Sequence, residues 1–212
     1  MIDKYPRTFH LKASPCLQND DKWHGDDNFF LDKEVVITEK MDGGCTGIHD
    51  GNVYARSTGQ IARHGSFDVV KAIHAPKTYG DERVFYGENL YGVHSIEYGE
   101  LPDVFFLFGV LTDGVWSSWD DLTAIAAEMS FKTVPCLFRG TFTSMKDLEA
   151  WMEGEIKKPS TYGGHREGFV IRTAGSFTDF SQNVAKYVRA GHVQTDEHWS
   201  KNWSPARFKF HE

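Results

Sequence analysis

The sequence is poor in cysteine: Cys16, Cys45 and Cys136 lie far apart and form no CxxC pair. This usage argues against a disulfide framework and a zinc site, and it indicates free thiols in a reducing compartment. The histidines show no HExxH spacing either. No apolar run approaches the roughly 18 residues of a membrane span, and residues 1–12 lack the apolar segment of a signal peptide. We therefore expect a cytoplasmic protein that makes no contact with a membrane.

Positive charge is also scarce, because 23 Lys and Arg stand against 30 Asp and Glu, for a formal net charge of −7. Such a balance gives no global attraction to nucleic acid, so any polyanion must be met by a local basic patch. Hydrophobic residues make up 40% of the chain and aromatic residues 14%, with 16 phenylalanines. This composition excludes a disordered chain and predicts a globular fold with a substantial core.

Short strand-like runs dominate the remainder, and several are joined by Asp-Gly turns. They cover 34–40, 46–50, 52–57, 83–90, 104–111, 115–119, 133–138, 168–173 and 184–190. Helical patterns cover 66–75, 120–129 and 144–158, while 1–30 and 175–183 read as loops. The helices fall between groups of hairpin-linked strands, which predicts an α+β fold with antiparallel sheets rather than a doubly wound parallel sheet.

The stretch TEKMDGGCTG at 38–47 places Lys40 at the end of a strand, directly before an Asp-Gly-Gly turn. Alternation along the strand puts Lys40 and Asp42 on one face and Glu39 and Met41 on the other. A lysine that acts as a nucleophile must lose its proton, and burial and neighbouring cations lower its pKa. The pattern fits such a nucleophile, and it equally fits a surface lysine before an ordinary turn.

Four further charged residues stand in apolar strands. Glu88, in FYGENLYG, and Glu167, in REGFVIRT, need partners if they are buried, and ribose hydroxyls, a divalent metal ion or salt bridges can supply them. Arg56, in VYARS, and Lys186, in VAKYVRA, are candidates for holding phosphate oxygens. Taken singly, each cation also fits a solvated surface charge.

Six short motifs follow one another in a familiar order. They are KMDG at 40–43, ARS at 55–57, FYGEN at 85–89, FFLFGV at 105–110, EGFVIR at 167–172 and AKYVRA at 185–190. In this order and at these intervals they resemble motifs I, Ia, III, IIIa, IV and V of the covalent nucleotidyltransferases. That superfamily comprises ATP-dependent DNA and RNA ligases and the mRNA capping guanylyltransferases. Within it, the chain looks most like the ATP-dependent RNA ligases of the RNA ligase 2 group.

The resemblance implies a fold and a domain organisation. We expect an α+β nucleotidyltransferase (ATP-grasp-like) core of antiparallel sheets flanked by helices, forming a single domain over residues 1–212. Only 23 residues follow Arg189. We expect no appended OB-fold, as in DNA ligases and capping enzymes, and no separate C-terminal domain, as in many RNA ligases.

The resemblance also implies a role for each motif. Lys40 would attack the α-phosphorus of ATP, releasing pyrophosphate and forming a lysyl-AMP phosphoramidate. Glu167 would bind the catalytic Mg²⁺ or Mn²⁺, and Lys186 would stabilise the α-phosphate and the leaving group. AMP would then pass to an RNA 5′-phosphate, and an RNA 3′-hydroxyl would displace it.

Nucleotide binding would fall to Glu39, Asp42, Arg56, Glu88 and Phe108. Glu88 would hold the ribose hydroxyls, and Arg56 would contact the phosphate, the sugar or the RNA terminus. Phe108 would stack on adenine, with Phe106 on the same strand face as the second candidate.

One departure concerns the last motif, where the superfamily usually places two lysines two residues apart on one face. Here Val184, Lys186 and Val188 share that face, so one lysine has become valine. Arg189 would point to the opposite face. Arg172 and Arg166 are the candidates to replace the missing lysine.

Candidate RNA contacts are basic residues outside the nucleotide set: Arg63, His165, Arg166, Arg172 and Arg189. The segment 191–203, with two histidines and two tryptophans, fits either a nucleic-acid surface or packing on the core. With a net charge of −7, we expect weak, strongly salt-sensitive RNA binding confined to one face.

The sequence therefore predicts an ATP-dependent RNA ligase acting on RNA ends, and two alternatives stay open. One is a ligase for DNA or DNA–RNA hybrid ends, including nicked duplexes. The other is a nucleotide- or RNA-end-binding module that has lost turnover. No feature indicates a protein partner.

Overall fold

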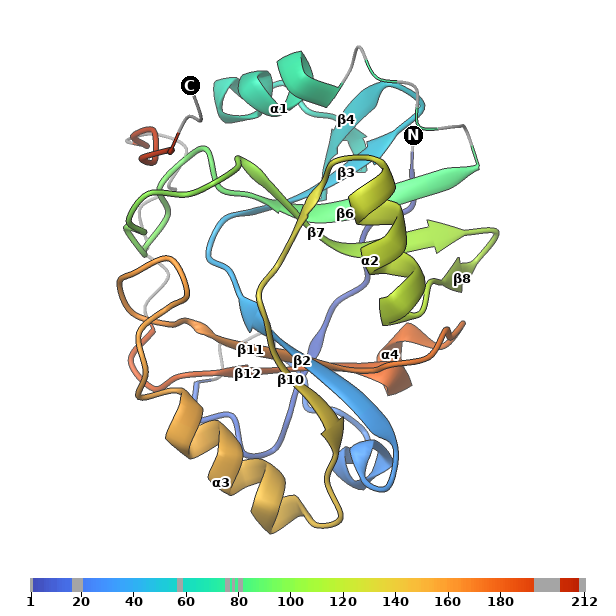
Figure 1. Ribbon diagram of the computed structural model, residues 1–212, viewed down its shortest axis with the longest axis vertical. Coiled ribbons are helices and arrows are strands. Elements are labelled where there is room, and N and C mark those ends of the chain that lie inside the picture. Colours follow the sequence, from blue (N-terminus) through green and yellow to red (C-terminus); the bar gives the residue numbers. More distant parts are fainter. Residues whose placement is uncertain are drawn as a thin grey trace.

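The computed structural model describes residues 2–16, 21–56, 59–74, 77, 79, 82–192 and 203–209. Two β-sheets lie one above the other, with α1 over the upper end of the molecule and α3 over the lower end (Figure 1). The smaller sheet runs in the order β1 (Phe9–His10), β12 (Val184–Val188), β11 (Gly168–Thr173), β2 (Glu34–Lys40) and β10 (Cys136–Thr141).

The larger sheet runs in the order β5 (Gln60–Ile61), β4 (Asn52–Ala55), β3 (Gly44–His49), β6 (Arg83–Asn89), β7 (Phe105–Thr112) and β8 (Val115–Trp116), with β9 (Lys132–Thr133) also paired to β7. The helices are α1 (Asp68–His74), α2 (Trp119–Glu128), α3 (Met145–Glu155) and α4 (Phe180–Asn183), with 3₁₀ turns η1 (Asp27–Phe30) and η2 (Gly65–Phe67). None of the helices in the described ranges is long and apolar enough to cross a membrane.

The predicted α+β class is confirmed, and several local predictions are wrong. The sheets are mixed, because β1 pairs with β12 and β9 pairs with β7 in parallel. The strand predicted over 115–119 ends at Trp116, since the Ser118 side chain accepts a hydrogen bond from the Asp121 N–H and caps α2. The run 133–138 is split into β9 and β10 around Pro135, which has no N–H for the ladder.

The two segments predicted as loops also contain short regular elements. Residues 1–30 include β1 and η1. The stretch 175–183 ends in α4, where the Asp179 side chain accepts from the Gln182 N–H and caps the helix. None of these three elements has the length that a periodic pattern needs, so hydrophobic periodicity could not reveal them.

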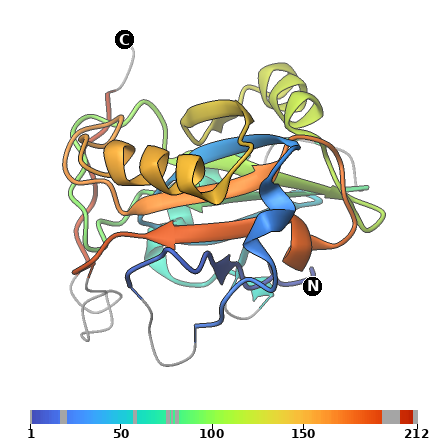
Figure 2. The ribbon, with the colours of Figure 1, turned by 90° about the horizontal axis from the view of Figure 1, so that it is seen from below.

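The smaller sheet has two different faces because side chains alternate along its strands. One face packs against α3 in a core that includes Val35, Ile37, Phe169, Ile171 and Tyr187. Figure 2 shows α3 lying along this face, with β1 at the sheet edge beside β12. The opposite face carries Thr38, Lys40, Val170, Arg172, Val184, Lys186 and Val188 toward the space between the sheets.

Two glycines bring the strands together at the point where the sheets meet. Gly168 pairs with Lys40 on one side and Val188 on the other, and a Cβ there would lie 1.9 Å from the Tyr187 carbonyl oxygen. A Cβ on Gly43 would lie 2.5 Å from the Asn89 carbonyl oxygen. Both positions therefore require glycine, and the second lets the turn after Lys40 approach β6 closely.

Candidate active site

A cavity of about 750 Å³ opens between the two sheets and collects most of the predicted site residues. Its lining includes Glu39, Lys40, Asp42, Arg56, Glu88, Phe108, Glu167, Arg172 and Lys186. Arg63, His165, Arg166 and Arg189 lie outside this lining. The fold thus brings together groups from β2, β6, β7, β11 and β12 that are far apart in the sequence.

Lys40 lines this cavity, with its Nζ 2.6 Å from Oε1 of Glu167. Glu167 is 2% exposed and Lys40 26% exposed, so the carboxylate is shielded from water and the lysine is partly buried. Burial alone lowers the pKa of Lys40, but Glu167, Glu88 and Asp42 together outweigh it and raise the pKa above its ordinary value. The free protein therefore holds Lys40 protonated, because the charged groups that act on it most strongly are acidic.

Glu88 stands on β6 opposite Cys45 of β3, at the upper side of the same cavity. Burial raises its pKa to about 8, and the nearby carboxylates of Glu167 and Asp42 act in the same direction against Lys40 and the Gly43 N–H. Near pH 7 this carboxyl is therefore mostly protonated, with one hydroxyl donor and one carbonyl acceptor. That combination suits a vicinal diol such as a ribose.

Asp42 is fixed by a loop that the sequence did not single out. Its Oδ2 accepts hydrogen bonds from the Ser95 N–H at 2.8 Å, the Ser95 hydroxyl at 2.7 Å and the Ile96 N–H at 2.8 Å. Its own N–H donates to the Tyr98 hydroxyl oxygen at 2.7 Å. These bonds anchor the turn after Lys40, and they join residues more than 50 positions apart, which no local pattern encodes.

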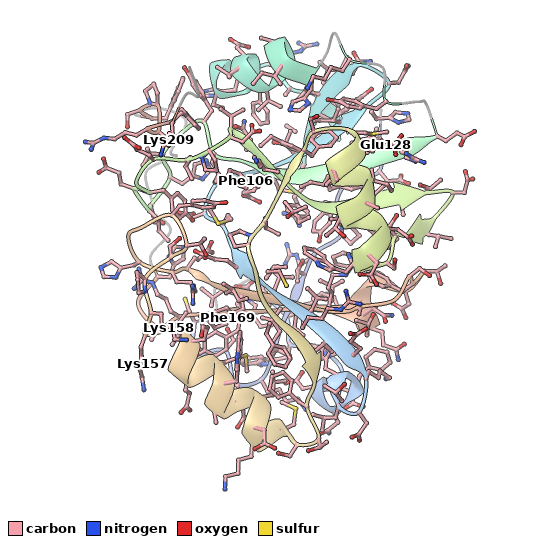
Figure 3. All side chains as sticks on the ribbon, in the orientation of Figure 1. Phe106, Glu128, Lys157, Lys158, Phe169 and Lys209 are labelled. Atoms are coloured by element: carbon pink, nitrogen blue, oxygen red, sulfur yellow. The ribbon has the colours of Figure 1, made fainter. Side chains whose placement is uncertain are left out.

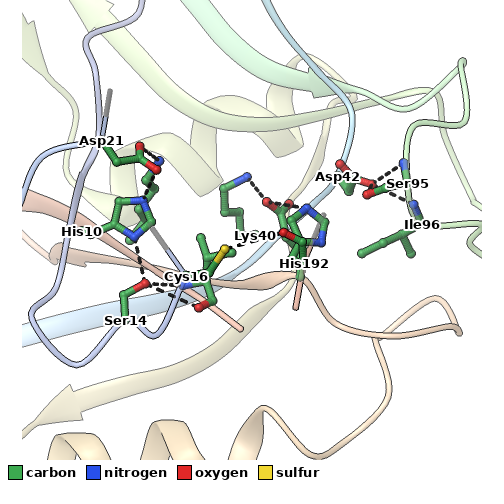
Figure 4. A network of polar contacts seen from close by, with 12 residues as sticks. His10, Ser14, Cys16, Asp21, Lys40, Asp42, Ser95, Ile96 and His192 are labelled. Carbon is green, nitrogen blue, oxygen red and sulfur yellow. Dashed lines mark hydrogen bonds and ion pairs between the residues drawn. The ribbon is translucent and has the colours of Figure 1, made fainter. Parts of the chain in front are cut away.

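Lys186 occupies the other end of the cavity and is held by the N-terminal segment (Figure 4). Its Nζ lies 3.0 Å from Oδ1 of Asp21, and Oδ2 of Asp21 lies 3.1 Å from Nε2 of His10. Nδ1 of His10 lies 2.8 Å from the Ser14 hydroxyl, which accepts a bond from the Val188 N–H at 3.0 Å. Burial and Lys186 lower the pKa of His10 to about 4, so its imidazole is neutral at pH 7.

The pKa of Lys186 is lowered, first by burial and further by the charge of Lys40, with Asp21 opposing. This is the opposite direction from Lys40, although both amines face one cavity. The sequence treated residues 1–30 as loop and assigned His10 no role. The contact between Asp21 and Lys186 spans 165 residues, so only the folded chain reveals it.

Aromatic side chains form the wall near β7. Phe108 lines the cavity and is half-buried, whereas Phe106 is fully buried in the core against Tyr162. Figure 3 shows Phe106 in the interior of the upper sheet and Phe169 in that of the lower one. The Tyr5 ring lies 4.9 Å from that of Phe108, edge to face, and the Tyr5 carbonyl accepts a bond from Nε of Arg56 at 3.2 Å.

Glu39 lies at the edge of this cavity, but its carboxylate is engaged elsewhere. Oε2 accepts from the Thr161 N–H at 3.0 Å and the Thr161 hydroxyl at 2.8 Å, and Nε of Arg166 lies 3.6 Å away. Oε1 of Glu39 has no hydrogen-bond partner among the described residues. Glu39 therefore ties β2 to the loop before β11.

Of the two candidates for the missing lysine, Arg172 reaches the cavity and Arg166 does not. Arg172 pairs across the strands with Val184, donates to the Ser117 carbonyl and lies over the Phe177 ring at 5.1 Å. Burial lowers its pKa to about 10, so it stays a cation at neutral pH. Arg166 instead donates to Glu155 on the α3 side.

Three buried groups form a candidate metal site: the ligand atoms of Asp42, Glu167 and His192 all lie within 4.8 Å of one another. Nε2 of His192 is 3.4 Å from Oε1 of Glu167. Within the described residues, Glu167 Oε2 and His192 Nε2 have no hydrogen-bond partner. Two carboxylates and one imidazole suit a divalent cation such as Mn²⁺ or Mg²⁺. The sequence predicted Glu167 as a metal ligand and missed His192. The only feature of the sequence that could have indicated His192 is its position four residues after the end of β12.

The fold is that of ATP-dependent ligases. A Naegleria gruberi RNA ligase with AMP and Mn superposes with a TM-score of 0.58 at 14% identity, covering 88% of this chain and 56% of that one. An archaeal ATP-dependent RNA ligase gives 0.57 at 14%, covering 87% and 48%. An Aquifex aeolicus protein described as a candidate ATP-dependent DNA ligase gives 0.57 at 18%, covering 88% and 50%.

The family follows from the sequence itself, since the RNA ligase family model matches residues 33–188. The chain belongs to the RNA ligase family. A search of curated proteins finds no significant match. The chain spans about half the length of the solved structures to which it is similar.

Proposed function

We propose that the chain is an ATP-dependent RNA ligase that works through a lysyl-AMP intermediate at Lys40. The observation that carries this proposal is a partly buried lysine amine 2.6 Å from Glu167, in a cavity that also holds Glu88, Phe108 and Lys186. The family match and the ATP-dependent ligase fold support it. One of the similar structures contains ATP and Mn.

In the first step, Nζ of Lys40 attacks the α-phosphorus of ATP. The N–P bond forms, the bond from phosphorus to the bridging oxygen breaks, and pyrophosphate leaves with that electron pair. Lys40 must first release its proton, which the nearby carboxylates retain in the free protein. When Glu167 contacts another cation instead, the Lys40 amine loses most of the attraction that stabilises its charged form, and its pKa falls.

Asp42, Glu167 and His192 are the residues that would hold a divalent ion, Mg²⁺ or Mn²⁺. Bound there, the ion supplies positive charge that offsets the triphosphate. At the other end, Lys186 and Arg172 meet the α-phosphate and the departing pyrophosphate, with Lys186 held in place by Asp21.

The nucleotide contacts divide between the two sheets. Glu88 binds the ribose hydroxyls, and Phe108 stacks on adenine. Arg56, which is exposed at the cavity rim, contacts the nucleotide phosphate or the incoming RNA terminus. Asp42 orients the turn that carries Lys40, and Glu39 holds that strand to the 160–162 loop.

In the later steps, AMP passes from Lys40 to the 5′-phosphate of an RNA, and a 3′-hydroxyl displaces it to form the phosphodiester. The basic residues expected along the RNA path are Arg63, His165, Arg166, Arg172 and Arg189. We place this reaction in the cytoplasm, where the free thiols of the chain remain reduced.

The test is the intact mass of the protein after incubation with ATP and Mg²⁺, beside Lys40→Ala. Protein treated with pyrophosphate beforehand carries no AMP from purification. A gain of one AMP in the wild type, absent in Lys40→Ala, is the expected result. No gain under these conditions would refute covalent transfer and leave a nucleotide-binding module.

A second arm separates the polymers. Wild-type protein with the AMP adduct is offered 5′-phosphorylated RNA, DNA and nicked RNA or hybrid duplexes, with GTP as the nucleotide control. Adenylylated RNA ends and sealed RNA are expected. Sealing of DNA ends alone would favour the DNA ligase alternative, and a covalent GMP would favour a capping enzyme.

A further inference from the structure

A second cavity, of about 500 Å³, lies apart from the active site and is lined by basic side chains. They are Lys157, Lys158, His165, Arg166 and Arg189. No aspartate or glutamate belongs to this lining within the described ranges of the chain. Figure 3 shows Lys157 and Lys158 beside the C-terminal end of α3. We call this set the basic pocket.

Arg189 is the residue in the basic pocket that most needs a ligand. Its side chain is half-buried, and its Nε is shielded from water without a hydrogen-bond partner. In the described part of the chain, its guanidinium forms no hydrogen bond, ion pair or ring contact. A buried donor without a partner is costly, and an anion bound in the pocket would accept a hydrogen bond from it.

The charges around the pocket do not cancel. Nη1 of Arg166 donates to Oε1 of Glu155 at 2.9 Å, and its Nε lies 3.6 Å from Oε2 of Glu39. Lys158 pairs with the other oxygen of Glu155 at 2.6 Å. The two carboxylates thus offset two of the four full positive charges. Lys157, exposed and unpaired among the described residues, and Arg189 remain, together with the exposed His165.

The position of this excess charge relates it to the catalytic strands. The Arg189 N–H donates to the Glu167 carbonyl at 3.0 Å, and Arg166 directly precedes Glu167. Gly168, the next residue, pairs with both Lys40 and Val188. The basic pocket therefore lies at the same strand ends as Lys40 and Glu167, on the α3 side of the sheet. Successive residues of a strand are only about 3.3 Å apart, so a polynucleotide bound in the active site reaches the basic pocket by passing around these strand ends.

We propose that the basic pocket binds internal phosphodiester groups of the RNA strand whose end is in the active site; this rests on the proposed ligase function. Its chemistry matches a phosphate, because the arginine fork and a flexible lysine supply charged donors. It also answers how a chain of net charge −7 holds a polyanion, through a local excess of positive charge. The terminal 5′-phosphate belongs to the first cavity, and the phosphates that follow it belong here.

The test measures RNA binding by fluorescence anisotropy for Lys157→Gln, Arg189→Gln and the double variant, over a series of salt concentrations. Each substitution should weaken binding about three- to tenfold at low salt and reduce the salt slope by about 0.7, the value for one single-strand phosphate contact. Arg189→Lys should keep the slope of the wild type. Lys146→Gln is the matched control, because it removes an exposed lysine from the first turn of α3, whereas the basic pocket lies beyond the last turn of that helix.

Two comparisons make the result specific. RNAs with a 5′-phosphate and a 5′-hydroxyl should lose affinity equally, because the pocket is assigned internal phosphates. Unfolding midpoints of the variants show whether each is folded before binding is compared. Wild-type affinity and salt slope in the folded double variant would overturn the proposal. A loss of affinity confined to 5′-phosphorylated RNA would overturn it as well. So would variants that bind polyglutamate more weakly but bind RNA as tightly as the wild type.

This outcome is independent of the ligase chemistry. Covalent AMP transfer is measured by mass without RNA, so failure of the adduct refutes the proposed function and does not affect the binding series. Conversely, normal adduct formation with unchanged RNA binding in the variants refutes the basic pocket alone.

Discussion

The two ends of the active-site cavity each hold a lysine, and they treat it in opposite ways. Lys40 is surrounded by Glu167, Glu88 and Asp42, which raise its pKa despite burial. Lys186 has Asp21 as its partner and is also affected by Glu167, but burial and the charge of Lys40 prevail, so its pKa falls. Burial lowers the pKa of both lysines, and the direction depends on whether the nearby acidic groups outweigh it. In the proposed reaction the proton on Lys40 must leave before it attacks ATP, whereas Lys186 supplies positive charge to phosphate.

The largest effect is expected from removing the nucleophile while keeping its charge. Lys40→Arg retains a cation beside Glu167, so the variant should fold with an unfolding midpoint close to that of the wild type. Its guanidinium does not deprotonate, and intact mass should show no AMP adduct. An adduct of normal yield on this variant would show that another residue is the nucleophile and would end the comparison between the two lysines.

The other lysine should matter less, because it stabilises charge without forming a bond. Lys186→Ala should slow adduct formation by about 10²- to 10³-fold, measured as the single-turnover rate with ATP in excess, as for loss of one preorganised donor. The adduct should still reach full yield at long times. Lys132→Ala, which changes an exposed lysine of β9, is the control. An unchanged rate would assign the phosphate contact to Arg172 alone.

A third test concerns the acidic end and its metal. His192→Ala should weaken Mn²⁺ binding about tenfold, followed by electron paramagnetic resonance without ATP, because one of three clustered ligands is lost. Glu167→Gln should weaken it at least as much. His165→Ala serves as the control, since His165 is exposed outside this cavity. Equal affinity of His192→Ala and the wild type would remove His192 from the metal site.

The sequence predicted the charged residues of the cavity far better than their partners. Lys40, Glu88 and Lys186 stand on strands and Glu167 directly precedes one, so their alternation and spacing are local properties, and the cavity contains all four. The partners of these residues come from elsewhere: Asp21 for Lys186, and Ser95 for Asp42. These contacts join distant segments without regular periodicity, so only tertiary packing brings them together.

The same reason limits what the sequence can say about the contacts of Glu39 and the pKa of Lys40. Alternation correctly separated Glu39 from Lys40, but it could not show that Thr161 and Arg166 take up the Glu39 carboxylate. Nor could composition give the sign of the Lys40 pKa shift, which depends on three acidic residues from three segments. Local patterns fix which side chains share a surface, and the electrostatics of that surface require its full set of neighbours.

The remaining effects are on stability, and they depend on pH in opposite directions for Glu88 and His10. The pKa of Glu88 is raised to about 8 from 4.5, so its folded form binds the extra proton. Its contribution is therefore lost as pH rises from 4.5 to 8. The pKa of His10 is lowered to about 4 from 6.5, so the unfolded form binds the extra proton and stability is lost as pH falls through that window.

Substitution should separate these two slopes. The difference in unfolding free energy between Glu88→Gln and the wild type should grow in favour of the variant by about 1.4 kcal/mol per pH unit from pH 5.5 to 7.5. For His10→Gln, the difference should move in favour of the variant by a similar slope as pH falls from about 6 to 4.5. Urea unfolding across pH 4.5 to 8 measures both. If the unfolding free energies of a variant and the wild type change with pH in parallel, the substituted side chain has the same pKa in the folded and unfolded chain. The contrast between the surroundings of Lys40 and those of Lys186 would then depend on the two lysines alone.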